Sequence, residues 1–111
     1  MEARTTPSAV VSECLRKDNY ANWSVCVKSY MLANNLWEFI IREIPANRNN
    51  WPGWERRNAR ALHAIQISCG PDILSQIRHI ESAREAWNSL DRMYGTMPSF
   101  KLAIEQGNPS I

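Results

Sequence analysis

Hydrophobic residues recur with a helical period along most of the chain, beginning near residue 20. Between Tyr20 and Met31 they are separated by three, four or one position, the spacing that places side chains on one face of an α-helix. Asp18–Asn19 predicts a side-chain N-cap for this helix, and Asn34–Asn35 predicts its end, because asparagine tolerates the left-handed conformation found at helix ends. Leu36–Ile41 predicts a short second helix that covers the end of the first.

The middle of the chain contains the clearest loop and then a second helical stretch. Two prolines, a glycine and three asparagines in residues 45–53 leave no periodic element there. From Trp54 to Cys69 the apolar residues again have a helical period, and Gly70–Pro71 predicts the end of that helix, with glycine just past its last turn. Residues 71–77 predict a short helix with proline in its first turn.

The best-defined helix start lies at Ser82. Ser82 and Glu85 have the spacing of a capping box, in which the two side chains reciprocally satisfy backbone donors. One apolar face then runs from Ala83 to Tyr94, and Gly95 predicts the end of the helix. No stretch alternates with the period of a strand. The pattern predicts an all-α fold, a compact bundle of four to five helices, whose core comprises Tyr20, Trp23, Val27, Met31, Trp37, Trp54, Leu62, Ile65, Ile77, Trp87, Leu90 and Tyr94.

The two ends of the chain differ from its helical middle. Residues 1–14 predict a flexible leader, and a short stretch from Val10 to Leu15, at its end, can dock on the core. Residues 15–95 form the predicted helical domain. Residues 96–111 combine a linker with one or two helical turns, which are too short to fold alone. They either pack back on the domain, begin a further module or form a disordered tail.

Composition and charge favour one small intracellular domain. The chain has 111 residues, 44% hydrophobic and 22% charged, which suits a single modest core. A formal net charge of +2 is too near neutral for a general polyanion binder. No apolar run is long enough for a bilayer span or a signal peptide, so we expect a cytoplasmic or nuclear location. Cys14, Cys26 and Cys69 form no Cys-x-x-Cys pair, and each is expected to be a small buried residue.

The sequence contains no recognisable catalytic or metal-binding constellation. His63 and His79 are the only histidines, and neither lies four residues from another His or Cys, as a helical metal pair requires. Phosphate-binding glycine loops and the Gly-x-Ser-x-Gly motif are absent. We therefore expect no enzymatic activity, no catalytic or metal-binding residues and no cofactor.

Basic and aromatic residues gather around the loop at 45–53. Such a mixture suits single-stranded nucleic acid, because rings stack on bases while guanidiniums meet phosphates. It also suits a protein interface, in which Trp and Arg are favoured anchors. A solvated helix face with arginines and no ligand would explain the same residues. With a protein partner favoured over nucleic acid, the candidate interface comprises Arg48, Trp51, Arg56, Arg57 and Arg60.

Two blocks of the helical domain resemble a known family. The first is Leu15-x-x-Asp18-Asn19-Tyr20-x-x-Trp23, followed by Leu36–Trp37, and the second is Ser82-Ala83-x-Glu85-Ala86-Trp87-x-x-Leu90-x-x-x-Tyr94. In this order they resemble the N-terminal part of Gag polypeptides of Copia-type LTR retrotransposons, over roughly residues 15–95. The stretch Asn58–Asp72 is similar to plant proteins in which a Gag-derived domain precedes ankyrin repeats. Phe100–Asn108 resembles the opening helix of such a repeat.

The resemblance implies an α-helical domain like the N-terminal part of a capsid protein, which works through protein contacts. A complete Gag continues into a second helical domain and a Cys-Cys-His-Cys zinc knuckle that binds RNA, and this sequence shows neither. We therefore expect a non-enzymatic domain that associates with itself, as a homodimer or larger oligomer, or with another protein. Binding of RNA or other single-stranded nucleic acid is the alternative.

Overall fold

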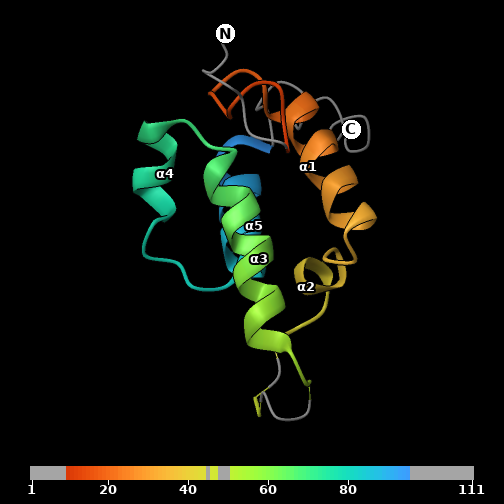
Figure 1. Cartoon of the computed structure of the whole chain (residues 1–111). Helices are drawn as coiled ribbons and strands as arrows, with labels where there is room; N and C mark the ends of the chain where they lie inside the picture. The colour runs from red at the N-terminus through yellow and green to blue at the C-terminus, as the bar shows by residue number, and fades with distance from the viewer. Residues whose placement is uncertain (1–9, 45, 48–50, 96–111) are drawn as a thin grey trace, which may run out of the picture.

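Five α-helices and one π-helical turn make up the computed structural model, which describes residues 10–44, 46–47 and 51–95. In chain order they are α1 (Tyr20–Ala33), α2 (Glu38–Ile41), α3 (Trp54–Ile67), α4 (Pro71–Ile77), α5 (Ala83–Leu90) and the π-helix η2 (Asp91–Gly95). In Figure 1, α3 stands in the middle, with α1 on one side, α4 on the other and α5 behind it. The predicted all-α fold is confirmed. Between the described residues the β-type pairing is limited to an isolated bridge of Leu15 with Cys69.

The start of α1 differs from the prediction. Asn19 occupies the N-cap position, but its side chain makes no capping hydrogen bond. Its Oδ1 instead accepts a hydrogen bond from the backbone N–H of Arg16 at 2.6 Å, and its Nδ2 donates to the carbonyl of Cys14 at 3.0 Å. The side chain therefore folds the loop that precedes α1 and leaves the first turn of the helix uncapped by a side chain.

The end of α1 follows the prediction. Asn35 has a φ of 58°, the left-handed conformation expected of asparagine at a helix end. The N–H of Leu36 donates to the carbonyl of Met31 at 2.8 Å, and the N–H of Asn35 donates to the carbonyl of Leu32 at 3.3 Å. These two bonds form a Schellman motif. Because Leu36 and Met31 are both buried, the motif directs the chain back toward the core and into α2.

The segment before α1, residues 11–15, lies against the C-terminal end of α3 and is called the strap. The N–H of Leu15 donates to the carbonyl of Ser68 at 2.8 Å. The indole N–H of Trp23 donates to the same carbonyl at 2.7 Å. Val11 and Leu15 are 5% and 1% exposed, so this part of the predicted leader contributes to the core. The rest of the leader, residues 1–9, and the predicted tail at 96–111 lie outside the described residues.

The junction between α3 and α4 contains a glycine with a different role from the one predicted. Gly70 has a φ of −67° and a ψ of 163°, ordinary extended backbone, so it does not end α3 by a left-handed turn. A Cβ at Gly70 would lie 3.3 Å from the carbonyl oxygen of Leu15. Glycine therefore permits the close approach of the strap. Pro71 begins α4, as predicted.

Two side chains fix the start of α5. The hydroxyl of Ser82 accepts a hydrogen bond from the N–H of Glu85 at 3.2 Å, which is one half of the predicted capping box; the return bond from the N–H of Ser82 to the Glu85 carboxylate is not formed among the described residues. Asn58 of α3 adds a contact that the sequence pattern does not reveal. Its Oδ1 accepts from the N–H of Ala83 at 2.8 Å, and its Nδ2 donates to the carbonyl of Glu81 at 2.8 Å. One local and one distant side chain thus satisfy backbone groups at this helix end.

The last helical turn is π-helical, whereas the sequence predicts an α-helix up to Gly95. Within this turn, Asp91 accepts a hydrogen bond from the hydroxyl of Tyr20 at 3.2 Å, and the hydroxyl of Tyr94 accepts one from Gln76 Nε2 at 3.1 Å. A Cβ on Gly95 would collide with the side chains of Asp91 and Tyr20. The wider turn therefore connects the end of α5 to α1 and α4.

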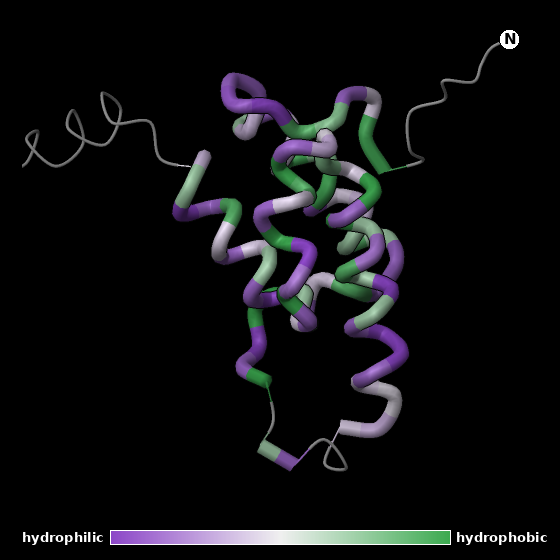
Figure 2. The backbone as a smooth tube through the Cα atoms, turned by 90° about the vertical axis from the view of Figure 1, so that its left-hand side faces the viewer, coloured by the Kyte–Doolittle hydropathy of each residue, from purple (hydrophilic) through white to green (hydrophobic). Residues whose placement is uncertain are grey.

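Apolar side chains from the strap and from α1 to α5 form one main core cluster, with a smaller cluster beside it. Hydrophobic and hydrophilic positions alternate along the helices, as Figure 2 shows. Seven of the predicted core residues are buried in the main cluster: Tyr20, Trp23, Val27, Met31, Ile65, Ile77 and Leu90. Four more are half-buried against it: Trp37, Leu62, Trp87 and Tyr94. The smaller cluster contains Phe39, Trp51 and the predicted core residue Trp54.

Candidate interaction surface

Trp51, expected from the sequence to be an exposed interface anchor, is buried. It is 9% exposed and stacks on Phe39, with ring centroids 4.5 Å apart and planes 12° from parallel. The guanidinium carbon of Arg42 lies 3.8 Å from the centre of the Trp51 ring. The expectation was wrong because α2 supplies an apolar partner that the helical period of α3 cannot reveal. Since protein groups already cover it, the Trp51 ring is not available to stack on a nucleic-acid base.

The predicted arginines lie on the outer side of α3. Arg56, Arg57 and Arg60 are exposed, and none forms an ion pair with an acidic side chain of the described residues. Arg56 and Arg60 are four positions apart, a spacing at which like charges on a helix repel each other weakly. Arg48 lies outside the described residues. The structure therefore groups three of the four arginines on one helix, without an exposed ring of Trp51 to accompany them.

A second surface, which the sequence analysis did not identify, lies on the outer side of α1. Val25 and Leu32 are 64% and 54% exposed. They are seven positions apart, which is about two helical turns, so they lie on the same side of the helix. Ala21 and Ser29 are also exposed on this side. Lys28 is the sole charged residue among the 14 residues of α1. That scarcity of charge was visible in the sequence and is the signal that could have revealed this surface.

The apolar surface continues from α1 onto α2. An open groove of about 250 Å³ is lined by Leu32, Asn35, Trp37, Glu38 and Ile41. Ile41 is 58% exposed, so the groove adds a further large apolar side chain to those of α1. We call the outer side of α1 and this groove the α1–α2 face, defined by Ala21, Val25, Ser29, Leu32, Trp37 and Ile41.

The few charges at the border of the α1–α2 face interact within the protein. Lys28 Nζ lies 5.1 Å from the centre of the Trp37 ring, a cation–π contact. Glu38 forms an ion pair with Arg42 at 3.6 Å. Such an exposed pair contributes little to stability, but it leaves the face without an unpaired acidic group among the described residues. The α1–α2 face is therefore suited to apolar contact.

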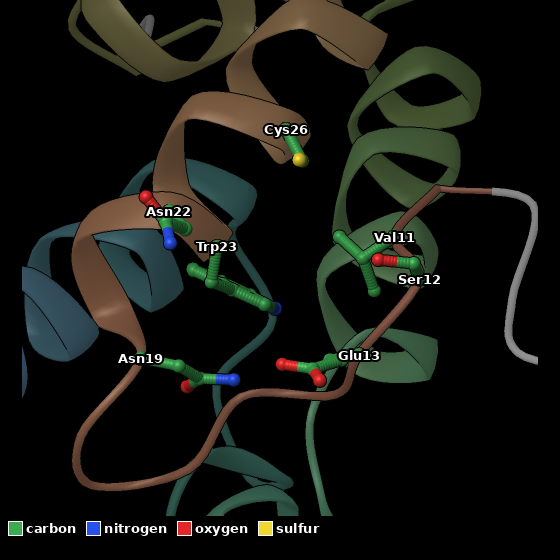
Figure 3. A pocket seen from close by; sticks show the side chains of 7 residues that line it. All are labelled: Val11, Ser12, Glu13, Asn19, Asn22, Trp23 and Cys26. Carbon is green, nitrogen blue, oxygen red and sulfur yellow. The ribbon is translucent and has the colours of Figure 1, made fainter.

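A small cavity lies between the strap and the start of α1 (Figure 3). Its volume is about 50 Å³, and its lining comprises Val11, Ser12, Glu13, Asn19, Asn22, Trp23 and Cys26. A space of this size holds a few water molecules at most. It brings one carboxylate and no second acid, base or histidine to the same place, so it offers no pair of groups for acid–base chemistry.

Two titratable side chains have pKa values that burial raises. Burial is the main cause that raises the pKa of the Cys69 thiol to about 12. Burial, followed by the charge of Asp91 and the hydrogen bond to it, also raises the pKa of the Tyr20 hydroxyl. Both groups are therefore neutral near pH 7. A buried neutral thiol or phenol is a poor nucleophile, so neither group supports covalent catalysis.

The other cysteines and the histidines lie at the surface. Cys14 and Cys26 are exposed, which corrects the expectation that all three cysteines are buried: Cys14 lies on the strap, and Cys26 lies on the side of α1 that faces the small cavity. His63 and His79 are exposed on separate parts of the chain. In the part of the chain that the structure describes, no three His, Cys, Asp or Glu side chains come close enough to hold a metal ion. Nor does this part contain a helix long and apolar enough to cross a membrane.

Residues 15–41 match a family described as "Domain of unknown function (DUF4219)". This domain is found in retrotransposon Gag-like proteins. The matched segment contains the last residue of the strap, α1 and α2, and it therefore includes the whole α1–α2 face. No curated protein and no solved structure matches the chain. The family match defines the class as a helical domain that is similar, over this segment, to retrotransposon Gag-like proteins.

Proposed function

We propose that this domain is a non-enzymatic interaction module that associates with itself and derives from the capsid region of a Copia-type Gag polypeptide. The observation that carries the proposal is the α1–α2 face, where Val25, Leu32 and Ile41 are all more than half exposed. Large apolar side chains that gather on one surface typically mark a contact site for another molecule. The face lies within the segment that matches the Gag-like family.

A comparison of α1 with α3 shows that the outer side of α1 carries unusually little charge. α1 and α3 each have 14 residues. α3 exposes a glutamate and three arginines, as expected for a helix whose outer side meets water. α1 instead exposes Val25, Leu32 and a single charged residue, Lys28. A helix that is apolar on its inner side and largely uncharged on its outer side is typical of one that another protein covers.

The finer identity of the module rests on its motifs. The order Asn-Tyr-x-x-Trp, Leu-Trp and Ala-Trp-x-x-Leu supports an origin in a Copia-type Gag, and the similarity around Asn58–Asp72 supports a plant protein with ankyrin repeats. The proposed partner is another copy of the chain or another intracellular protein, in the cytoplasm or the nucleus.

Light scattering coupled to size-exclusion chromatography tests self-association without knowledge of a ligand. We expect the measured mass to rise above that of a monomer as the protein concentration increases. Leu32→Lys, which places a charge on the α1–α2 face, is expected to return the mass to the monomer. Ile67→Lys is the matched control, because Ile67 is 41% exposed at the end of α3 and lies outside the face. A monomeric mass up to high micromolar concentration contradicts the proposal.

Binding of single-stranded RNA is the second candidate function. The exposure of Arg56, Arg57 and Arg60 on one side of α3, without acidic partners among the described residues, favours it. Each phosphate contact with a single strand steepens the salt dependence of log affinity by about 0.7. Replacing all three arginines by glutamine is therefore expected to reduce the slope by about two. A mass increase that requires RNA and disappears in this variant favours the second function over self-association.

A further inference from the structure

We infer that the α1–α2 face packs against the same face of a second copy, with the two α1 helices antiparallel about a twofold axis near the middle of α1. The inference rests on the proposed self-association and adds its geometry. α1 extends from Tyr20 to Ala33, so its midpoint lies between Cys26 and Val27. A twofold axis makes the contact reciprocal, as an interface between identical surfaces requires, and we place it at the midpoint because that position pairs large with small side chains.

The order of large and small side chains along α1 suits this antiparallel pair. With the axis at the midpoint, Leu32 of one copy lies opposite Ala21 of the second copy, and the reverse holds at the other end. The large side chain thus meets a small one at both ends of the contact. Between them, Val25 of each copy lies beside the axis and opposite Lys28 of the other copy, whose ammonium group lies over its own Trp37 ring. The exposed Val25 and Leu32 therefore become covered in one arrangement, which buries apolar surface from both copies.

The distribution of charge also favours a second copy over a charged partner. Lys28 is held against Trp37, and Glu38 is paired with Arg42. A polyanion or a strongly charged peptide would lose hydration on this face without gaining opposite charges in return. The same face of a second copy adds one charged residue of α1, Lys28, which is held against its own Trp37, so the contact covers few charges.

The size of the contact predicts a weak dimer. The outer side of a 14-residue helix is a strip about 20 Å long and about 10 Å wide. Even with the α2 groove added, such a strip buries much less than the roughly 800 Å² per partner of a stable complex. We therefore expect association only at high micromolar concentration. Many copies held in one assembly would strengthen such a contact through avidity.

The native cysteine at position 26 reports directly on this geometry. Cys26 is exposed and lies next to the midpoint of α1. Cys26 follows Val25 by one position, about 100° around the helix, so it lies at the strap-side edge of the α1–α2 face, where it also lines the small cavity. A twofold axis at the midpoint places the Cys26 residues of the two copies along the same edge of the contact, on helices whose axes are about 8–10 Å apart. That separation is within reach of a short bis-maleimide cross-linker. Cys14 is also exposed but lies on the strap, and Cys69 is buried, so Cys14 serves as the matched control.

The experiment treats the full chain at high micromolar concentration with a short bis-maleimide and measures the covalent dimer. We expect the dimer in the wild type and in Cys14→Ser, and its loss in Cys26→Ser and in Leu32→Lys. Circular dichroism checks that each variant keeps its helices. A covalent dimer that requires Cys14, or that persists in Leu32→Lys, overturns the geometry.

Light scattering on the same samples separates this inference from the proposed function. Concentration-dependent association without a Cys26 cross-link overturns the α1-to-α1 geometry and leaves the proposed function standing. A monomer at every concentration contradicts both. As a further check, Val25→Cys in a Cys14→Ser/Cys26→Ser background is expected to form a disulfide-linked dimer under mild oxidation, because Val25 lies beside the axis. Ala59→Cys, exposed on α3, is expected to form none.

Discussion

The side-chain oxygen of Asn58 accepts a hydrogen bond from the backbone N–H of Ala83 at 2.8 Å, so that α3 caps the first turn of α5. Asn58 is 6% exposed and lies on the apolar side of α3. Its amide nitrogen also donates to the carbonyl of Glu81 at 2.8 Å. One buried side chain therefore fixes where α5 begins and how it is placed against α3.

Asn58→Ala is expected to lower the free energy of unfolding by about 2 kcal/mol, because it leaves the buried N–H of Ala83 and the partly buried carbonyl of Glu81 without this partner. Urea denaturation followed by circular dichroism measures the loss. Asn88→Ala is the control, since Asn88 is exposed on α5, and its effect is expected to stay within about 0.5 kcal/mol. Equal losses in the two variants would show that Asn58 does not hold the start of α5.

Ser82→Ala is expected to cost about 1 kcal/mol, because the N–H of Glu85 loses the acceptor of its capping bond. Thermal denaturation measures the loss, and amide hydrogen exchange at Glu85 is expected to accelerate. Ser75→Ala is the matched control. The Ser75 hydroxyl donates to the carbonyl of Asp72 on the exposed side of α4, and its removal is expected to change stability by less than about 0.5 kcal/mol.

Trp87 lies between two other indoles and is half-buried. Its ring stacks on Trp23 with centroids 5.9 Å apart and meets the edge of Trp37 at 5.4 Å. Trp87→Ala is expected to lower the free energy of unfolding by about 2–3 kcal/mol, less than for a fully buried tryptophan. Trp87→Phe keeps an aromatic ring between the two partners and is expected to lose less. A loss below about 1 kcal/mol in Trp87→Ala would mean that these contacts contribute little.

Substitution of Trp51 is expected to lower stability without weakening nucleic-acid binding, and substitution of the α3 arginines is expected to do the reverse. Trp51→Ala removes the stack on Phe39 and the contact with Arg42, and it is expected to cost about 3 kcal/mol in unfolding free energy. It is not expected to change the affinity for single-stranded RNA. Replacing Arg56, Arg57 and Arg60 by glutamine is expected to do the opposite. Fluorescence anisotropy with labelled RNA and urea denaturation check the two effects, and reduced RNA affinity in a folded Trp51→Ala protein would contradict the buried role.

Stability is expected to fall at alkaline pH because of Cys69 and Tyr20. The pKa of both groups is raised in the folded protein, so the unfolded chain releases these protons at lower pH than the native protein does. Raising the pH therefore favours unfolding. The loss begins near pH 9 for Cys69 and near pH 10 for Tyr20, the ordinary values of the two groups. Each contributes a slope of at most about 1.4 kcal/mol per pH unit.

Denaturant unfolding between pH 7 and pH 11 measures this dependence. Cys69→Ala and Tyr20→Phe each remove one titrating group, and each is expected to flatten the alkaline part of the curve. Cys26→Ser is the control, since Cys26 is exposed. Stability that is unchanged up to pH 11 in the wild type would contradict the expected dependence.

Local signals predicted the helices well because their causes lie within a few residues. The left-handed Asn35, the proline that begins α4 and the hydroxyl of Ser82 each act on backbone groups beside them. The errors arose where a distant neighbour decides the conformation. Glycine is needed at position 70 because the carbonyl of Leu15 lies close to it, and Trp51 is buried because it stacks on Phe39. The spacing of residues in the sequence contains no information about either contact.

The candidate interaction surfaces likewise combine features that local sequence predicts with features that depend on distant neighbours. The period of α3 predicted that its arginines face outward, and the structure places Arg56, Arg57 and Arg60 there. The burial of Trp51 depends on α2 and could not be predicted from the loop. The α1–α2 face combines Leu32 of α1 with Ile41 of α2 in one groove, a neighbourhood that only the folded chain reveals. The low charge of α1 is present in the sequence, but the helical period of its buried residues, such as Tyr20 and Trp23, indicates only the inner side of the helix.

Leu15 and Trp23 belong to the segment shared with Gag-like proteins, yet both donate hydrogen bonds to the carbonyl of Ser68, which lies beyond it. If recombination moved residues 15–41 alone into another gene, the buried indole N–H of Trp23 would lose its acceptor. That loss would lower the free energy of unfolding by about 1–3 kcal/mol. Such a transfer would also remove the helices against which α1 packs. The smallest segment that keeps these contacts when it is transferred therefore extends at least past the end of α3.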